Sequence, residues 1–145
     1  MITQISVLLE NEPGKLSVPC RALARAGINI MALSLTATNR LGVLRLIVPD
    51  AERAMEVLAA ADCVAEADDV VVVAVPDRPG GLEDVLEIVD AAHINLEYVY
   101  SFTRPVGESA VLVCSFADAP AATAALQAAN VSIKDDLPAL QQGGQ

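Results

Sequence analysis

An internal repeat constrains the fold of this chain more than any other feature of its sequence. Pro13-Gly14 returns as Pro79-Gly80, 66 positions further on, and Leu16 returns at the same spacing as Leu82. Tandem similarity at a fixed spacing indicates two copies of one supersecondary unit. Other positions match in the same way: Ile28-Asn29-Ile30 with Ile94-Asn95-Leu96, Asp50-Ala51 with Asp118-Ala119, and Leu58 with Leu126.

The two copies are predicted to be two small domains, residues 1–68 and 69–145. In a chain of 145 residues each copy is close to the lower size limit of an independent domain, and both gain by packing on another surface. Only Ala65-Glu66-Ala67-Asp68-Asp69 joins them. So short a connection favours two units that pack closely as one rigid body. Residues 138–145 are expected to fray.

Each copy reads as β-α-β-β-α-β, from the alternation of apolar residues in strands and their helical spacing in helices. In the first copy, strands are expected at residues 2–9, 28–38, 43–48 and 63–67, with helices between Pro13 and Gly27 and after Asp50. In the second copy, strands are expected at 70–75, 94–103, 109–116 and 131–134, with helices at 79–92 and from Asp118 to Ala129. One further turn is expected at 137–140.

Composition and charge narrow the classes of partner. Hydrophobic residues make up 54% of the chain and aromatic residues only 3%, so the core must consist of Val, Leu, Ile and Ala. The net charge is −10, and the nine Lys and Arg form no basic run, which argues against binding to the phosphates of a nucleic acid.

Three widely spaced cysteines, Cys20, Cys63 and Cys114, fit neither a disulfide framework nor a zinc site. They are expected to be buried free thiols.

The chain shows no targeting or membrane signal. Met1-Ile2-Thr3-Gln4 lacks a basic start and an apolar h-region, and Asp or Glu interrupts every apolar run before about 18 residues. We therefore expect a cytoplasmic protein without a membrane partner.

The turn that opens each copy is the strongest candidate for a binding site. Asn11-Glu12-Pro13-Gly14-Lys15-Leu16 and Asp77-Arg78-Pro79-Gly80-Gly81-Leu82 each stand between a strand and a helix. Proline is predicted at the first helical position, and the glycine beside it removes a Cβ that would keep a ligand off the backbone. Such a helix start offers N–H groups and a partial positive charge to a carboxylate. A plain strand-to-helix connection is the alternative.

With an apolar strand before each turn and Ile-Asn-Ile after the first helix, the chain resembles the ACT domain, and more narrowly the stand-alone bacterial proteins made of two ACT domains. The resemblance covers nearly the whole chain. It implies an α+β fold of two tandem ferredoxin-like βαββαβ units with antiparallel sheets and helices on one face, and regulation by a bound amino acid. The implied ligand lies at the first strand-to-helix turn, against the start of the second strand of a neighbouring unit.

Carried over residue by residue, the resemblance implies ligand contacts at ten positions: Asn11, Pro13, Gly14, Asn29 and Ile30, and Asp77, Pro79, Gly80, Asn95 and Leu96. Asn11 and Asp77 stand two before the proline, where the family offers a side-chain oxygen to the ligand. Asn29 and Asn95 fit equally well a role in capping backbone groups at a strand start.

The two copies differ near the turn. Glu83 and Asp84 follow Asp77 in the first turn of the helix and would repel a carboxylate, so Asn11 is predicted to mark the better carboxylate site and Asp77 to meet an ammonium group or serve the fold. His93 stands where Gly27 stands in the first copy, and is expected at an exposed helix end. Tyr98, Tyr100 and Phe102 share a strand face, as core or as the wall of a pocket or dimer contact.

The predicted function is that of an amino-acid sensor without catalytic activity, cofactor or metal. Ligand binding at domain or subunit interfaces would change the assembly state, with a homodimer formed through sheet edges and an unidentified enzyme as a possible partner. The alternative is a structural protein–protein interaction module with no small-molecule ligand. The acidic pairs Asp68-Asp69 and Asp135-Asp136 are interpreted as solvated turns, because a metal site needs oxygen ligands from more positions.

Overall fold

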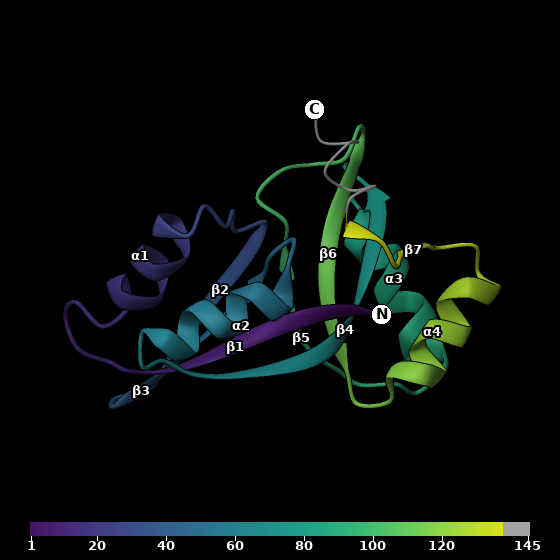
Figure 1. Ribbon diagram of the computed structural model, residues 1–145. Helices are drawn as coiled ribbons and strands as arrows, with labels where there is room; N and C mark the ends of the chain where they lie inside the picture. Colours follow the sequence, from purple (N-terminus) through teal and green to yellow (C-terminus); the bar gives the residue numbers. More distant parts are fainter. Residues whose placement is uncertain (138–145) are drawn as a thin grey trace. The chain divides into compact units, whose positions relative to one another are not determined.

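The computed structural model describes residues 1–137, and along them the same order of elements occurs twice (Figure 1). The first set is β1 (Ile2–Glu10), α1 (Ser17–Arg25), β2 (Ala32–Ala37), β3 (Leu41–Ile47) and α2 (Ala51–Ala60), followed by the long β4 (Val64–Pro76). The second set continues with α3 (Gly81–Ala91), β5 (Leu96–Ser101), β6 (Ser109–Phe116), α4 (Ala119–Ala128) and β7 (Ser132–Lys134). The predicted α+β fold of two βαββαβ units is confirmed. Leu137 is helical, and the rest of the turn expected at 137–140 lies outside the described residues, as does the segment 138–145 that was expected to fray.

Contacts divide the chain into two compact units. One contains Thr3–Asp68, and the other contains Met1–Ile2 together with the chain from Asp69 onward. The N-terminal ammonium of Met1 lies 3.4 Å from Oδ1 of Asp135, which ties the first residues to the second unit.

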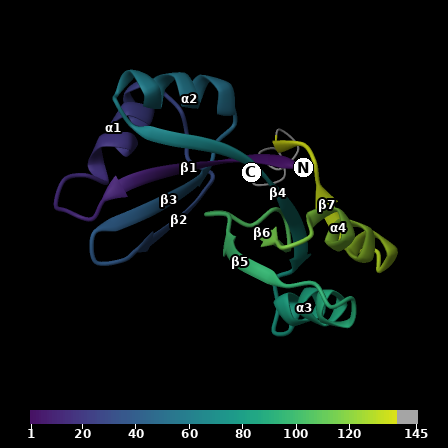
Figure 2. The ribbon, with the colours of Figure 1, turned by 90° about the horizontal axis from the view of Figure 1, so that it is seen from below.

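The first unit is an antiparallel sheet covered on one face by two helices. β3 lies between β2 and β1, so that Leu46 pairs with Leu33 on one side and with Ile5 on the other. α1 and α2 lie side by side on the same face of this sheet (Figure 2). The side chains between sheet and helices form one apolar core: Ile5, Val7, Leu23, Ile28, Leu44, Leu46, Val48, Ala54 and Leu58.

The second unit repeats this packing. β4 pairs with β6 and with β7, and β5 pairs with β6, all antiparallel. The helices α3 and α4 pack against each other, and the core contains the repeat partners of residues buried in the first unit. Leu58 and Leu126, which match in the repeat, are both fully buried. The complete cluster is Val71, Val73, Val75, Val85, Val89, Cys114, Phe116, Ala122 and Leu126.

The helices α1, α2, α3 and α4 end in the same way. The residue after each C-cap adopts a positive φ: 72° at Gly27, 59° at Asp62, 57° at His93 and 64° at Asn130. The N–H of the following residue then bonds back to a carbonyl in the last turn of the helix, as from Ile94 to Val89 at 2.9 Å. His93 is exposed at such an end, which confirms its predicted place.

Several predicted boundaries were wrong. One strand, β4, replaces the two strands expected at 63–67 and 70–75, and Asp68 and Asp69 are exposed strand residues instead of a turn. Gly and Pro, the residues that most strongly interrupt a strand, are absent from residues 64–75. β2 and β5 begin later than the expected residues 28 and 94, because the N–H groups of Ile28 and Ile94 bond to the preceding helix and not to a sheet.

Candidate ligand-binding site

The strand-to-helix turns form two corners with the same backbone path: the first corner, residues 11–18, and the second corner, residues 77–84. Three equivalent N–H···O=C bonds hold each path. In the first corner they run from Asn11 to Arg40 (2.8 Å), from Glu12 to Glu10 (2.9 Å) and from Lys15 to Glu12 (3.2 Å). In the second corner they run from Asp77 to Glu108 (3.1 Å), from Arg78 to Pro76 (2.9 Å) and from Gly81 to Arg78 (3.1 Å).

The glycine of each Pro-Gly pair is required by its backbone conformation. Gly14 has φ +87° and Gly80 has φ +88°, in a region that residues with a Cβ rarely adopt. A Cβ built on Gly14 would meet no atom within 4 Å. Within the single chain, the backbone at Gly14 is therefore open to the approach of another molecule.

The prolines do not occupy the first helical position, so that prediction was wrong. α1 begins at Ser17 and α3 at Gly81, each after the glycine with positive φ. Since a right-handed helix cannot include such a residue, Pro13 and Pro79 lie in the turn before the helix.

Backbone N–H groups without an acceptor remain at both corners. Among residues 1–137, no acceptor is found for the N–H groups of Gly14, Leu16 and Ser17, or for their equivalents Gly80, Leu82 and Glu83. The N-cap residues Leu16 and Gly80 make no side-chain cap. By contrast, the carboxylates of Asp50 and Asp118 cap α2 and α4 at 3.1 Å. The two uncapped helix starts are thus the two that follow the Pro-Gly turns.

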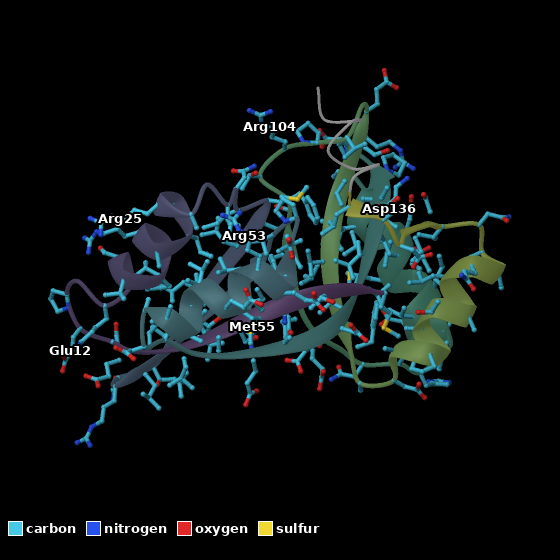
Figure 3. All side chains as sticks on the ribbon, viewed as in Figure 1. Glu12, Arg25, Arg53, Met55, Arg104 and Asp136 are labelled. Atoms are coloured by element: carbon cyan, nitrogen blue, oxygen red, sulfur yellow. The ribbon has the colours of Figure 1, made fainter. Side chains whose placement is uncertain are left out.

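Asn11 is held in place at the edge of the first corner. Its side-chain Nδ2 donates to the carbonyl of Thr38 at 2.8 Å, which connects the corner to the β2–β3 turn. The Oδ1 atom of Asn11 makes no hydrogen bond within the part of the chain that the structure describes. Residues 11–18 are all exposed, and Figure 3 shows the Glu12 side chain pointing outward from the turn after β1.

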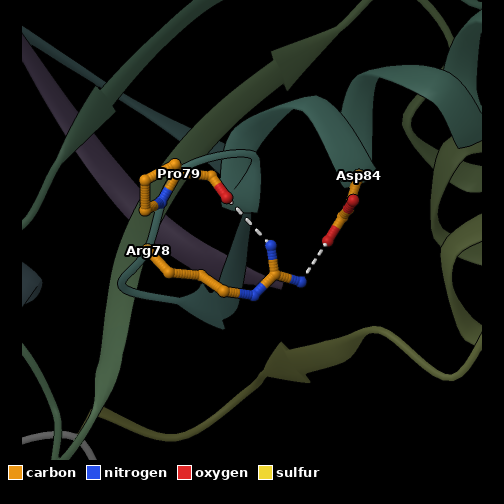
Figure 4. A network of polar contacts seen from close by, with 3 residues as sticks. All are labelled: Arg78, Pro79 and Asp84. Atoms are coloured by element: carbon orange, nitrogen blue, oxygen red, sulfur yellow. Dashed lines mark hydrogen bonds and ion pairs between the residues drawn. The ribbon is translucent and has the colours of Figure 1, made fainter.

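The second corner contains an additional contact. Arg78 folds over the start of α3, with Nη1 donating to the carbonyl of Pro79 at 2.9 Å and Nη2 lying 3.0 Å from Oδ2 of Asp84 (Figure 4). A hollow of about 420 Å³ beside this contact is lined by Pro76, Asp77, Arg78 and Glu108. Gly81 must also be a glycine, because a Cβ on it would collide with the carbonyl oxygen of Pro76.

The comparisons with known proteins agree with the repeated unit. A family model described as an ACT domain pair matches residues 1–138. The chain belongs to this family. It is similar to protein BT0572 from Bacteroides thetaiotaomicron, at 30% identity and a TM-score of 0.85, over 92% of this chain and 91% of that chain. The regulatory subunit of aspartate kinase from Thermus thermophilus shares the fold, at 21% identity and a TM-score of 0.62, over 88% and 90% of the two chains. No curated protein matches the chain.

The other four predicted contact residues of the ACT domain pair lie after α1 and α3. Asn29 and Asn95 are exposed and precede β2 and β5, and the backbone carbonyl of Asn95 accepts from Ala117 at 2.9 Å. Ile30 and Leu96 pack against the cores of their own units. Within one unit, the structure shows no hydrogen bond between these four residues and either corner in the described part of the chain.

Sequence reasoning missed the residues that support the corners from the hairpin turns. Thr38 and Arg40 accept hydrogen bonds from Asn11, and Glu108 accepts one from Asp77. The repeat contained a signal for them, because Arg40 and Glu108 are equivalent positions of the two hairpins. It contained none for the fold-over of Arg78, which has no basic counterpart in the first copy.

The metal-ligating side chains of the described residues form no cluster, and the cysteines are not paired. The segment 1–137 contains no group of three or more His, Cys, Asp or Glu that could hold a metal ion. The three cysteines are free: Cys114 is buried, whereas Cys20 and Cys63 are half-buried. Burial raises the pKa of Cys114 to about 12, and burial together with the Asp62 carboxylate raises the pKa of Cys63. None of the helices in 1–137 has the length and apolarity needed to cross a bilayer.

Proposed function

We propose that this ACT domain pair is a regulatory protein that binds a free amino acid at the first corner and responds by a change in assembly state. The observation that carries the proposal is the set of N–H groups of Gly14, Leu16 and Ser17, which have no acceptor in residues 1–137, at a helix start without a cap. Unpaired N–H groups at the start of a helix form a ready site for an anion.

The first corner offers partners for both charged groups of an amino acid, the carboxylate and the ammonium. A carboxylate is attracted by the uncapped N–H groups and by the positive end of the α1 dipole, whose first turn contains no acidic residue. The carbonyl oxygen of the Asn11 amide can accept from an ammonium group. Nδ2 of Asn11, bound to Thr38, fixes the orientation that leaves this oxygen available.

The exposure of the corner connects binding to assembly. Residues 11–18 are exposed, whereas a small-molecule site normally buries most of its ligand. A ligand held only by this corner would remain largely in water. We propose that a second protein surface completes the site, so that the amino acid stabilises the assembly in which that surface is present.

A thermal-shift screen of the twenty standard amino acids tests the proposal. A ligand at about 100 times its Kd adds roughly 2.7 kcal/mol to the free energy of unfolding, which moves the melting temperature by several degrees. Sedimentation velocity with and without the active amino acid then reports the assembly state. The ligand should lose its effect on Asn11→Ala and keep it on the matched variant Asp77→Ala.

The free state of all three cysteines supports a reducing compartment, and we propose the cytoplasm as the place of action.

An enzyme partner is also part of the proposal, because a regulatory protein needs a target to regulate. The regulatory subunit of aspartate kinase has the same fold, which makes a biosynthetic enzyme a reasonable first target to test.

One observation favours a second function, that of an interaction module without a ligand. β2 pairs with β3 alone among the described strands, and Leu33 and Leu35 on it are each 47% exposed. An open strand edge with exposed leucines is suited to pairing with another chain. If none of the twenty amino acids moves the melting temperature, this function replaces the first.

A further inference from the structure

We infer that the outer face of α1 binds the outer face of α3 in a second copy of this chain, so that copies join through unlike units. The inference rests on the proposed function for the existence of an assembly, and it names the surfaces that meet in it. The contact itself requires no ligand and is separate from the open edge of β2.

The helices α1 and α3 occupy equivalent places in the repeat but have opposite charges. α1 contains two arginines, Arg21 and Arg25, and no acid. α3 contains no base and four acids: Glu83, Asp84, Glu87 and Asp90. Glu87 is itself the counterpart of Arg21, at the repeat spacing of 66 residues. The same place on the fold is therefore basic in one unit and acidic in the other.

The charged side chains lie on the outer faces of the two helices. Arg21 and Arg25 are exposed and stand one helical turn apart, on one face of α1. Glu83 and Glu87 are exposed with the same spacing on α3. The core is contacted by other residues, such as Leu23 in α1, and Figure 3 shows the Arg25 side chain pointing outward from its helix.

These charges are not neutralised by neighbours. Within residues 1–137, the two arginines of α1 and the two glutamates of α3 make no ion pair and no side-chain hydrogen bond. Asp84, in contrast, pairs with Arg78 at 3.0 Å. Like charges four residues apart destabilise the helix that contains them. A local cost of this kind is typical of residues that serve binding instead of folding.

The spacing of the charges fits an antiparallel contact between two helices. Four residues separate the two arginines, and four separate the two glutamates, which is a rise of about 6 Å in each helix. In an antiparallel contact Arg21 faces Glu87 of the second copy, and Arg25 then faces Glu83 of that copy. The helix dipoles favour this orientation, because the positive end of each lies beside the negative end of the other.

Exposed apolar side chains adjoin the charges. Val18, three residues before Arg21 on the same face of α1, is 39% exposed, and Leu82 in the first turn of α3 is 40% exposed. Burial of apolar surface supplies affinity, whereas the charges select the partner, since two α1 helices or two α3 helices would repel each other. Each chain has one helix of each charge, so identical copies suffice to form the contact.

Charge reversal on either helix tests the inference. The acidic variant, Arg21→Glu with Arg25→Glu, has glutamates on both outer faces, and the basic variant, Glu83→Arg with Glu87→Arg, has arginines on both. Sedimentation equilibrium should show that each variant alone self-associates at least tenfold more weakly than the unmodified protein. An equimolar mixture of the two variants should associate again, because each supplies the charge that the other lacks.

The matched control is Glu52→Arg with Glu56→Arg on α2. These two glutamates are exposed, have the same spacing and begin in the first turn of their helix, as in α3. The control changes the net charge of the chain by the same amount as the basic variant and should leave self-association unchanged. Self-association of the unmodified protein should also weaken as salt is raised. Thermal unfolding verifies that each variant is folded.

The inference is overturned by an unmodified protein that stays monomeric with and without the amino acid found by the screen, by reversal variants that self-associate normally, or by a mixture that does not regain association. Self-association that depends on Leu33 and Leu35 but not on the arginines would instead place the contact at β2. Failure of the proposed function is distinct, because then no amino acid binds, whether or not charge reversal affects self-association.

Discussion

The residues that follow the helices show how a Cβ atom changes the free-energy cost of a backbone with positive φ. Gly27 and His93 occupy equivalent positions with φ of 72° and 57°. A side chain in this conformation costs about 1 kcal/mol relative to glycine. We predict that His93→Gly raises the free energy of unfolding by about 1 kcal/mol and that Gly27→His lowers it by a similar amount, measured by urea denaturation.

The control for this pair is Asn130, whose φ of 64° is tolerated by asparagine, so Asn130→Gly should gain less than His93→Gly. A His93→Gly variant that is less stable than the unmodified protein would show that the imidazole makes a contact that outweighs the backbone cost.

Cys114 gives the protein a defined sensitivity to alkaline pH. The pKa of its buried thiol is about 12, against 9.0 for a free thiol. Below pH 9 both folded and unfolded chains keep this proton, and above it only the unfolded chain loses it, so stability falls as pH rises towards 12. We predict that this group alone removes about 1.4 kcal/mol of stability between pH 8 and pH 10.

Urea denaturation of the unmodified protein and of Cys114→Ala at both pH values tests this prediction, because the other titrating groups cancel in the difference. The variant loses stability at every pH through the cavity it creates, but its pH dependence should be weaker by the stated amount. Equal pH dependence of the two proteins would contradict a buried, protonated Cys114.

At the scale of the helices, side-chain caps distinguish α2 and α4, which have them, from α1 and α3, which follow the corners and have none. Asp50 and Asp118 cap α2 and α4 through the N–H groups of Arg53 and Ala121, and replacing either by Ala should cost about 1 kcal/mol of unfolding free energy. Asp90, an exposed acid in the last turn of α3, is the matched control and should change stability by less than about 0.5 kcal/mol. Thermal unfolding of the three variants measures the difference, and equal effects would show that the caps are not formed in solution.

The order of the elements could be predicted from the sequence, but their limits at the corners could not. Periodicity identified α1 to α4, and the repeat identified their equivalence, because core positions such as Leu58 and Leu126 face the same environment in both units. The helix starts were placed too early, since a proline followed by glycine is compatible with a helix start in general. Only the positive φ of Gly14 and Gly80 delays it here.

The residues of the candidate site also divide into those that could be predicted from the sequence and those that could not. Asn11, Pro13 and Gly14, and their equivalents in the second copy, could be located because they are local in sequence and repeated. The contact of Arg78 with Asp84 could not, since it depends on a side-chain conformation that no spacing reveals. Nor could the supporting carbonyls of Thr38 and Arg40, which come from a turn distant in the chain.

For the whole molecule, the open edge at β2 leads to a prediction about assembly. If copies of this chain pair through sheet edges, replacing both Leu33 and Leu35 by Lys, each 47% exposed in the single chain, should weaken the dimer at least tenfold. Val64→Lys, at a residue 63% exposed on β4, is the control and should leave the dimer intact. Sedimentation equilibrium measures both, and a dimer unaffected by the double substitution would place the contact on another surface.

The central claim, that a free amino acid binds to the bare main chain of the first corner, is tested most directly by amide NMR of the labelled protein during titration with the amino acid selected by the screen. We predict that the N–H resonances of Gly14, Leu16 and Ser17 shift together and saturate, while those of Gly80, Leu82 and Glu83 move less. Saturable binding whose largest shifts lie outside residues 11–18 would contradict the account.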